Sequence, residues 1–356
     1  MFQHAFYQTQ QGEVFVQSQC MQHESVLANF FASILSNLGY STADPGRRIW
    51  TRNNKTAIVC LADDFNICSA DLSKSPDNWF ESDTVVITDN LITCDTQYTV
   101  LRMPVSYFGI FAYCPAPQNF TPSHRFHLSV NRLDSQRQLI LFELIAQSGG
   151  LDVVQQQDLV NFNAKDPSEF NNTVHDLQRN FVKHWQPLSE YYAGVYDQHW
   201  DTVLNSLPLL THSLSVEQAD LDAYLNLVVE TYAGNTTITF SEKIFRALVT
   251  PAPWAVFAAR GAVQHLVDLG FDVMSDIVDH SYDQCVQDNW PGRNKITNYI
   301  LTSIVNYHRI QQIDPAVLAA RCTQAAKHNQ QRLATMRAQW PGDFAQWLPG
   351  VIAQLE

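Results

Sequence analysis

The fold that this sequence predicts is an α/β fold with two Rossmann-like lobes and a helical C-terminal tail. Short strand-like runs alternate with segments of helical periodicity in both halves of the chain. Strands that alternate with helices indicate parallel sheets covered by helices. A chain of 356 residues, 46% of them hydrophobic, is long enough for two ordinary cores. We therefore expect an N-terminal lobe at 1–120, a second lobe at 121–300 and a tail at 301–356.

The first lobe shows one helical pattern and two strand patterns. The segment at 24–40 has apolar residues at helical spacing and closes on Gly39. The runs TAIVCLA at 56–62 and DTVVITD at 83–89 are typical of short buried strands. From 101 to 122 the sequence becomes irregular and contains four prolines, which indicates a linker and places the lobe boundary near 120.

The second lobe repeats the alternation of strand and helix. Strand patterns occur at 125–131, 224–231 and 252–259. Helical patterns follow them at 134–149, from 241 onward and at 261–270. The triplet FDV at 271–273 allows a short third strand, and the pattern from about 296 to the end is helical. Ligands of such sheets bind at the carboxyl ends of the parallel strands.

Composition excludes several classes of protein. The formal net charge of -13 disfavours non-specific binding to nucleic acid. No run reaches the roughly 18 apolar residues of a membrane helix, and the beginning of the sequence lacks the pattern of a signal peptide. Seven scattered cysteines without a CxxC pair indicate neither a disulfide framework nor a zinc site. We expect a cytoplasmic protein without a membrane span and without a bound metal.

The pair Glu242-Lys243 stands where a helix is expected to follow a strand. If the helix begins at Ser241, its first backbone N–H groups offer a partial positive charge to an anion such as a diphosphate. Lys243 adds a full charge in the first turn, and Arg246 either joins it or pairs with Glu242 one turn away. The alternative is a capping box at 239–242, in which Glu242 satisfies a backbone N–H and Lys243 is exposed to solvent.

Several short motifs follow one another in a characteristic order. They are LVVET with Glu230, FSEKIFR at 240–246, PWAV from Pro253, LGF at 269–271 and DHSYD at 279–283. This order resembles glycosyltransferases of the two-lobed GT-B type, in particular a bacterial and phage group, and the Glu-Lys helix resembles the donor-binding helix of α1,3-fucosyltransferases. Upstream, SVNRLDSQRQ keeps Asn131 and Arg132 of that group but has Gln136 where a histidine is usual. The resemblance covers about 125–283, with a gap at 166–214, and the first lobe shows no family motif.

The resemblance implies transfer of a sugar from a nucleotide-sugar donor to an acceptor hydroxyl, without a metal or another cofactor. Negative charge builds on the departing diphosphate, and preorganised cations stabilise it. Lys243, Arg246 and Arg132 are the candidates for this role, in that order. The remaining expected donor-binding residues are Glu242 for hydroxyl groups, Glu230 for the ribose or for orienting the lysine, Asn131 and Ser241. The structural alternatives are a salt bridge for Arg132 and a partner role to Tyr232 or Arg246 for Glu230.

Acceptor activation needs a general base near the attacking hydroxyl. The candidates that follow predicted strand ends are Asp63, Asp64 and Asp89. The structural alternative is that aspartate at such a position only terminates the strand. We choose Asp89 as the nominal general base. We interpret Asp220 and Asp222, which resemble a metal-binding D-x-D, as solvated surface. His124 and His127 lack further ligands at metal-binding spacing.

Two other functions stay open at this point. Gln136 and the lack of a recognisable base are compatible with a catalytically silent GT-B-like module that binds nucleotide or glycan. Phage relatives also raise a modified DNA base as an acceptor in place of a glycan, in the host cytoplasm, which requires a basic cleft and base flipping.

Overall fold

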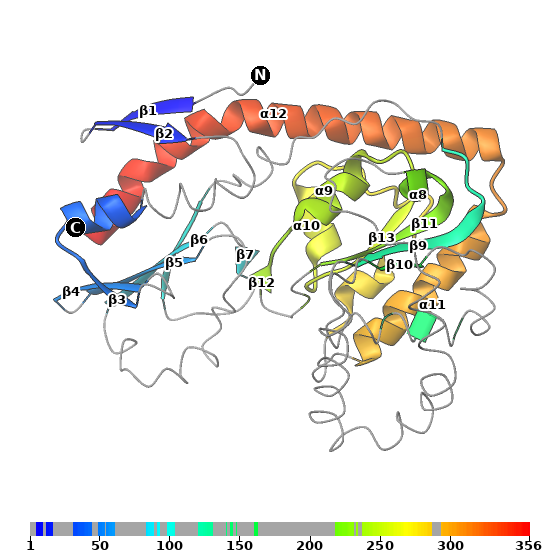
Figure 1. Ribbon diagram of the computed structural model, residues 1–356, viewed down its shortest axis with the longest axis horizontal. Helices are drawn as coiled ribbons and strands as arrows, with labels where there is room; N and C mark the ends of the chain where they lie inside the picture. The colour runs from blue at the N-terminus through cyan, green and yellow to red at the C-terminus, as the bar shows by residue number, and fades with distance from the viewer. Residues whose placement is uncertain are drawn as a thin grey trace, which may run out of the picture. The chain divides into compact units, whose positions relative to one another are not determined.

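The computed structural model is a mixed α/β structure with parallel strands and a long C-terminal helix (Figure 1). The structure describes residues 5–9, 12–16, 31–44, 49–53, 55–60, 83–88, 91–92, 98–103, 120–130, 140, 143–144, 147, 160–162, 218–230, 233, 237–286 and 293–356.

The chain divides into two compact units, each assembled from separate segments. Unit 1 comprises 1–112, 234–240 and 331–356, and unit 2 comprises 113–233 and 241–330. Each unit is described by itself. The lobe boundaries at 120 and 300 stay a prediction.

Unit 1 contains a five-stranded sheet in the order β3-β4-β5-β6-β8. Its strands are β3 (Ser41–Asp44), β4 (Ile49–Arg52), β5 (Lys55–Cys60), β6 (Asp83–Thr88) and β8 (Thr99–Arg102). The first three pair antiparallel, whereas β5, β6 and β8 pair parallel. The strands expected at 56–62 and 83–89 are therefore confirmed as β5 and β6.

Two smaller antiparallel pairs complete the described strands of unit 1. The strands β1 (Ala5–Thr9) and β2 (Gly12–Val16) pair antiparallel. The strands β7 (Leu91–Ile92) and β12 (Thr237–Ile238) pair with each other although they lie far apart in the sequence.

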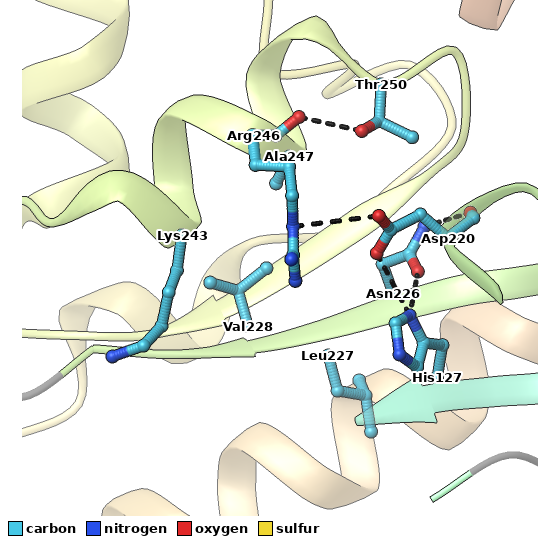
Figure 2. A pocket seen from close by; sticks show the side chains of 9 residues that line it. All are labelled: His127, Asp220, Asn226, Leu227, Val228, Lys243, Arg246, Ala247 and Thr250. Carbon is cyan, nitrogen blue, oxygen red and sulfur yellow. Dashed lines mark hydrogen bonds and ion pairs between the residues drawn. The ribbon is translucent and has the colours of Figure 1, made fainter. Parts of the chain in front are cut away.

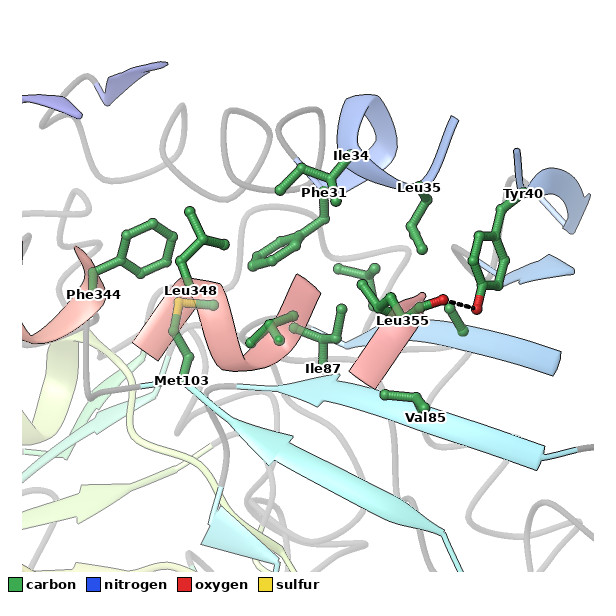
Figure 3. Close-up of a cluster of buried hydrophobic side chains, with 13 residues drawn as sticks. Phe31, Ile34, Leu35, Tyr40, Val85, Ile87, Met103, Phe344, Leu348 and Leu355 are labelled. Carbon is green, nitrogen blue, oxygen red and sulfur yellow. Dashed lines mark hydrogen bonds between the residues drawn. The ribbon is translucent and has the colours of Figure 1, made fainter. Parts of the chain in front are cut away.

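The core of unit 1 joins the sheet to helical residues from both ends of the chain (Figure 3). A helix at 31–37 ends where predicted, at Gly39, whose positive φ of 81° only glycine adopts readily. Its apolar side chains pack with inward-facing residues of β5 and β6 and with the last turns of α12 (Pro315–Leu355). The cluster consists of Phe31, Ile34, Leu35, Tyr40, Ala57, Val59, Val85, Ile87, Met103, Phe344, Leu348, Val351 and Leu355.

Unit 2 contains a parallel sheet in the order β10-β9-β11-β13. Its strands are β10 (Val160–Phe162), β9 (His124–Val130), β11 (Ala223–Val229) and β13 (Trp254–Phe257). They confirm the strands expected at 125–131, 224–231 and 252–259. Strands of a parallel sheet are buried on both faces, and every residue of β13 is buried.

Helices cover both faces of this sheet. The helices α9 (Glu242–Val249) and α11 (Arg293–Ile310) lie on opposite sides of it (Figure 1). The hydroxyl of Tyr299 on α11 donates toward the carbonyls of Val228 and Ala255, so it contacts β11 and β13 together. The helix α10 (Ala262–Asp268) follows β13, and the short α8 (Gln218–Leu221) precedes β11.

The short third strand allowed at 271–273 is not formed. Gly270 turns the chain with a φ of 83°, and the backbone of Asp272 then bonds to a side chain. Its N–H donates to Oδ1 of Asn329 on α12 at 2.8 Å, and its carbonyl accepts from Nδ2 of the same residue at 2.9 Å. Because one amide side chain satisfies both backbone groups, this segment packs as an irregular turn. The helical pattern predicted from 296 onward is confirmed by α11 and α12.

Candidate functional site

The helix α9 begins at Glu242, with Ser241 as its N-cap. Ser241 is extended, with φ -103° and ψ 179°, and its hydroxyl accepts a hydrogen bond of 3.3 Å from the backbone N–H of Lys243. A capping box that starts at Thr239 requires Glu242 in the third helical position, whereas it occupies the first. The alternative with Thr239 as the cap is therefore wrong, and the helix start expected at Ser241 is confirmed.

Glu230 connects the carboxyl end of β11 to the beginning of this helix. Its carboxylate accepts a hydrogen bond of 3.1 Å from the backbone N–H of Ser241, and the residue is only 2% exposed. The sequence predicted Tyr232, which lies outside the described residues, or Arg246 as the structural partner of Glu230 and did not indicate this backbone contact. A carboxylate at a helix N-terminus also interacts favourably with the helix dipole.

A pocket lies between α9 and the neighbouring strands; we call it the α9 pocket. Its empty space, open solvent included, is about 300 Å³. Lys243 and Arg246, two of the predicted cations, both line it. The full lining is His127, Asp220, Asn226, Leu227, Val228, Lys243, Arg246, Ala247 and Thr250 (Figure 2).

The two cations leave α9 in different directions (Figure 2). Arg246 turns toward Asp220, and its Nε lies 3.6 Å from Oδ2 of that carboxylate. Lys243 extends away from this ion pair and is largely buried, with 8% of the residue exposed. The side chain of Glu242, the other predicted partner of Arg246, lies outside the described residues. Arg246 thus pairs with a buried carboxylate, and the Lys243 side chain points in a different direction.

Asp220 is not part of a solvated surface, which corrects the interpretation of the D-x-D pattern. The residue is 5% exposed, and besides Arg246 it contacts His127, whose Nδ1 lies 3.0 Å from Oδ1. A buried carboxylate is costly unless it is paired and hydrogen-bonded. The polar sequence around Asp220 gave no sign of these partners, which lie on β9 and α9.

His127 and Asn226 form the polar floor of the α9 pocket. They are directly opposite each other in the pairing of β9 with β11, and Nδ1 of His127 lies 3.2 Å from Oδ1 of Asn226. Nδ2 of Asn226 donates to the carbonyl of Asp220 at 2.8 Å. Sequence reasoning considered His127 only as a metal ligand. The sequence signal that could have indicated this contact is the presence of a polar residue in each of two neighbouring buried strands.

The DHSYD motif serves the fold of unit 2. The hydroxyl of Tyr282 accepts a hydrogen bond of 2.9 Å from the N–H of Val256 on β13, at the edge of the sheet. Asp283 accepts from the N–H groups of Val263 and Gln264 in the first turn of α10, at 3.1 and 3.3 Å. Burial raises the pKa of the Asp283 carboxyl, while these two hydrogen bonds lower it. The motif therefore closes the sheet edge and caps a helix.

Lys295 is a second buried cation that sequence reasoning missed. Its Nζ donates to the carbonyls of Ala233 and Ala258, which follow β11 and β13, and lies 5.4 Å from the ring centroid of Phe257. Burial lowers its pKa to about 8, partly offset by the nearby Asp283 carboxyl. With its carbonyl partners in place, the ammonium holds two strand ends together.

Several predicted residues lie outside the part of the chain that the structure describes. They are Asp63, Asp64, Asp89, Asn131 and Arg132, together with the side chain of Glu242. Within the described part, Lys243 and Arg246 come together at one pocket, and Ser241 and Glu230 meet at the start of α9.

Comparison with known proteins finds no matching family model, no matching curated protein and no matching solved structure. In the described ranges no helix is long and apolar enough to cross a bilayer. The same ranges contain no cluster of three or more His, Cys, Asp or Glu side chains suited to a metal ion.

Proposed function

We propose that this chain is a glycosyltransferase of the GT-B type, which moves a sugar from a nucleotide-sugar donor to an acceptor hydroxyl without a metal. The observation that supports this most is the position of Lys243. It lies in the first turn of a helix whose beginning is bonded, through Glu230, to the carboxyl end of a buried parallel strand. Ligands of open parallel sheets bind beyond the carboxyl ends of the strands.

The proposed task of Lys243 is to stabilise the departing diphosphate. Two N–H groups at the helix start are already engaged, since that of Ser241 bonds to Glu230 and that of Lys243 bonds to Ser241. The charge of the lysine side chain, added to the helix dipole, is therefore the larger contribution to binding the diphosphate. Arg246 acts from its ion pair with Asp220, and Arg132, Asn131 and Glu242 complete the proposed donor site.

On the acceptor side, Asp89 is the proposed general base, in an N-terminal lobe that binds a glycan. If the protein comes from a phage and acts in the host cytoplasm, the acceptor to test is a modified DNA base. DNA binding that weakens steeply with salt would favour the second acceptor, because phosphate contacts release counterions. No binding to duplex at low salt would argue against it.

The test is a thermal-shift screen of the protein against UDP, GDP, ADP, CMP and their common sugars, carried out on wild type, Lys243→Ala and Lys327→Ala. Lys327 is an exposed lysine of α12, so its removal changes the net charge equally without touching α9. We expect one nucleotide class to raise the melting temperature of wild type and of Lys327→Ala but not of Lys243→Ala. No shift with any nucleotide would contradict the proposal.

Binding without turnover would favour the alternative, a silent module that binds nucleotide or glycan. Turnover is measured as release of the nucleoside diphosphate from the donor that gives the shift, with and without candidate glycans. In a transferase, Lys243→Ala lowers the turnover number as well as the affinity, because the lysine acts on charge that develops during bond breaking.

A further inference from the structure

We propose that an oxyanion bound in the α9 pocket accepts a hydrogen bond from Nε2 of His127, and that His127 takes up a proton when the anion binds. This deepens the proposed function, on which it rests for identifying the anion as the donor's diphosphate.

The hydrogen bonds of His127 determine which nitrogen carries the proton in the neutral ring. Nδ1 faces two acceptors, Oδ1 of Asp220 at 3.0 Å and Oδ1 of Asn226 at 3.2 Å. The amide of Asn226 is oriented by its Nδ2, which donates to the carbonyls of Asp220 and Pro253. Nδ1 must therefore be protonated, and Nε2 of the neutral ring carries a lone pair.

Nε2 is buried and has no hydrogen-bond partner among the described residues. The whole residue is 1% exposed, and it lines the α9 pocket. Figure 2 shows one ring nitrogen turned to Asp220 and Asn226 and the other turned away from them. Buried polar atoms in native proteins are normally hydrogen-bonded to protein groups, ordered water or a ligand, so Nε2 can form a hydrogen bond to a group bound in this pocket.

The charges around the ring favour an anion as that ligand. The charged groups that line the pocket with His127 are the carboxylate of Asp220 and the cations of Lys243 and Arg246. An anion oxygen that approaches the lone pair on Nε2 would be repelled, whereas a protonated Nε2 would donate a charge-assisted hydrogen bond to it. The carboxylate of Asp220, on Nδ1, stabilises the resulting imidazolium. Binding of the anion and uptake of the proton therefore favour each other.

Sulfate is the probe, because it keeps the same charge where histidine titrates, between about pH 5.5 and about pH 8.5. The full-length protein is labelled with ¹⁵N-histidine, and the His127 signal is assigned by its loss in His127→Gln. We expect sulfate to shift the ring nitrogen signal of His127 toward the protonated form. The dissociation constant for sulfate should rise with pH by up to about tenfold per unit, as one linked proton requires.

Three variants separate this contact from general effects of sulfate. His127→Gln should remove the proton-linked part of the pH dependence, and Asp220→Asn should weaken the shift of the His127 signal because the imidazolium loses its counterion. His308→Gln, which replaces an exposed histidine of α11, should behave as wild type. A His127 signal in wild type that does not respond to saturating sulfate would overturn the inference, and so would an unchanged pH dependence in folded His127→Gln.

The proposed function and the contact to His127 can each fail without the other. If sulfate binding is linked to a proton but no nucleotide changes the melting temperature, the anion site is supported and the proposed transferase function is contradicted. A nucleotide response that requires Lys243, with a His127 signal that stays unchanged, would contradict only the contact to His127.

Discussion

The carboxylate of Glu230 accepts a hydrogen bond of 3.1 Å from the backbone N–H of Ser241. This bond attaches the beginning of α9 to the end of β11, so it fixes the place from which the Lys243 side chain leaves the helix. A group that must meet a diphosphate benefits from such support, because misplacement of a charged group weakens its effect on the transition state.

Replacing Glu230 with alanine should lower the free energy of unfolding by about 1–3 kcal/mol, because it leaves a buried N–H without an acceptor. Glu230→Gln retains an acceptor oxygen at the same position and should cost less. Urea unfolding followed by circular dichroism measures both. Equal losses for alanine and glutamine would show that the hydrogen bond to Ser241 contributes little.

Ser241 offers a way to separate the stability of α9 from its binding function. Ser241→Ala should destabilise the protein by about 1 kcal/mol, the usual loss for an N-cap. Ser241→Asp keeps a capping oxygen but places a second carboxylate beside the buried Glu230, so it should also lose some stability, and its negative charge should repel the donor's diphosphate. Unfolding curves and nucleotide thermal shifts are measured on the same samples. Undiminished nucleotide binding by Ser241→Asp would place the diphosphate elsewhere.

His280 should make unit 2 sensitive to acid. Its Nε2 lies 2.8 Å from the carbonyl of Val273 and its Nδ1 lies 2.8 Å from the hydroxyl of Tyr282, and burial lowers its pKa in the folded protein. The unfolded chain therefore binds a proton first, so stability falls as pH decreases below about 6.5 and the loss ends at the lower folded pKa. At higher pH both states are neutral and His280 contributes no pH dependence.

The check is the difference between wild type and His280→Gln in urea unfolding, measured from about pH 5 to about pH 8. Other groups titrate in both proteins and cancel in this difference. We expect the stability of wild type to decline toward the acid side more steeply than that of the variant. Parallel curves would mean that folding does not perturb His280.

The last turns of α12 should contribute strongly to the stability of unit 1, because their apolar side chains belong to its core. Leu348 is 4% exposed within the hydrophobic cluster, and Leu348→Ala should cost about 2–5 kcal/mol. Gln354→Ala, on the exposed side of the same helix, should stay within about 0.5 kcal/mol of wild type. Thermal and urea unfolding report both changes. A loss for Leu348→Ala no greater than for Gln354→Ala would contradict the packing described.

Periodicity predicted the parts of the fold that depend on local sequence. The strands β5 and β6 lie where β-branched runs indicated them, β9 lies where an alternating pattern indicated it, and β11 and β13 lie where the sequence predicted buried strands. Helix ends were predicted correctly where the sequence contains a capping residue, as at Ser241 before α9 and at Gly39 after the helix at 31–37.

Contacts between distant segments could not be predicted in this way. Asp220 stands in a polar context and is nevertheless buried, because its partners His127 and Arg246 come from other elements. Asp272 leaves the expected strand because Asn329, far along the chain, binds its backbone. In both cases the partner that determines the structure lies too far along the chain to contribute to a local periodic pattern.

The hydroxyl of Tyr40 donates to the carbonyl of Leu355, a residue 315 positions later (Figure 3). During ribosomal synthesis the inward face of β5 and β6 is therefore made long before the helical turns that cover it. Until those turns emerge, Val59, Val85 and Ile87 present an apolar surface to other molecules in the cell. This apolar surface of unit 1 is therefore one that a chaperone could bind while the chain is being made.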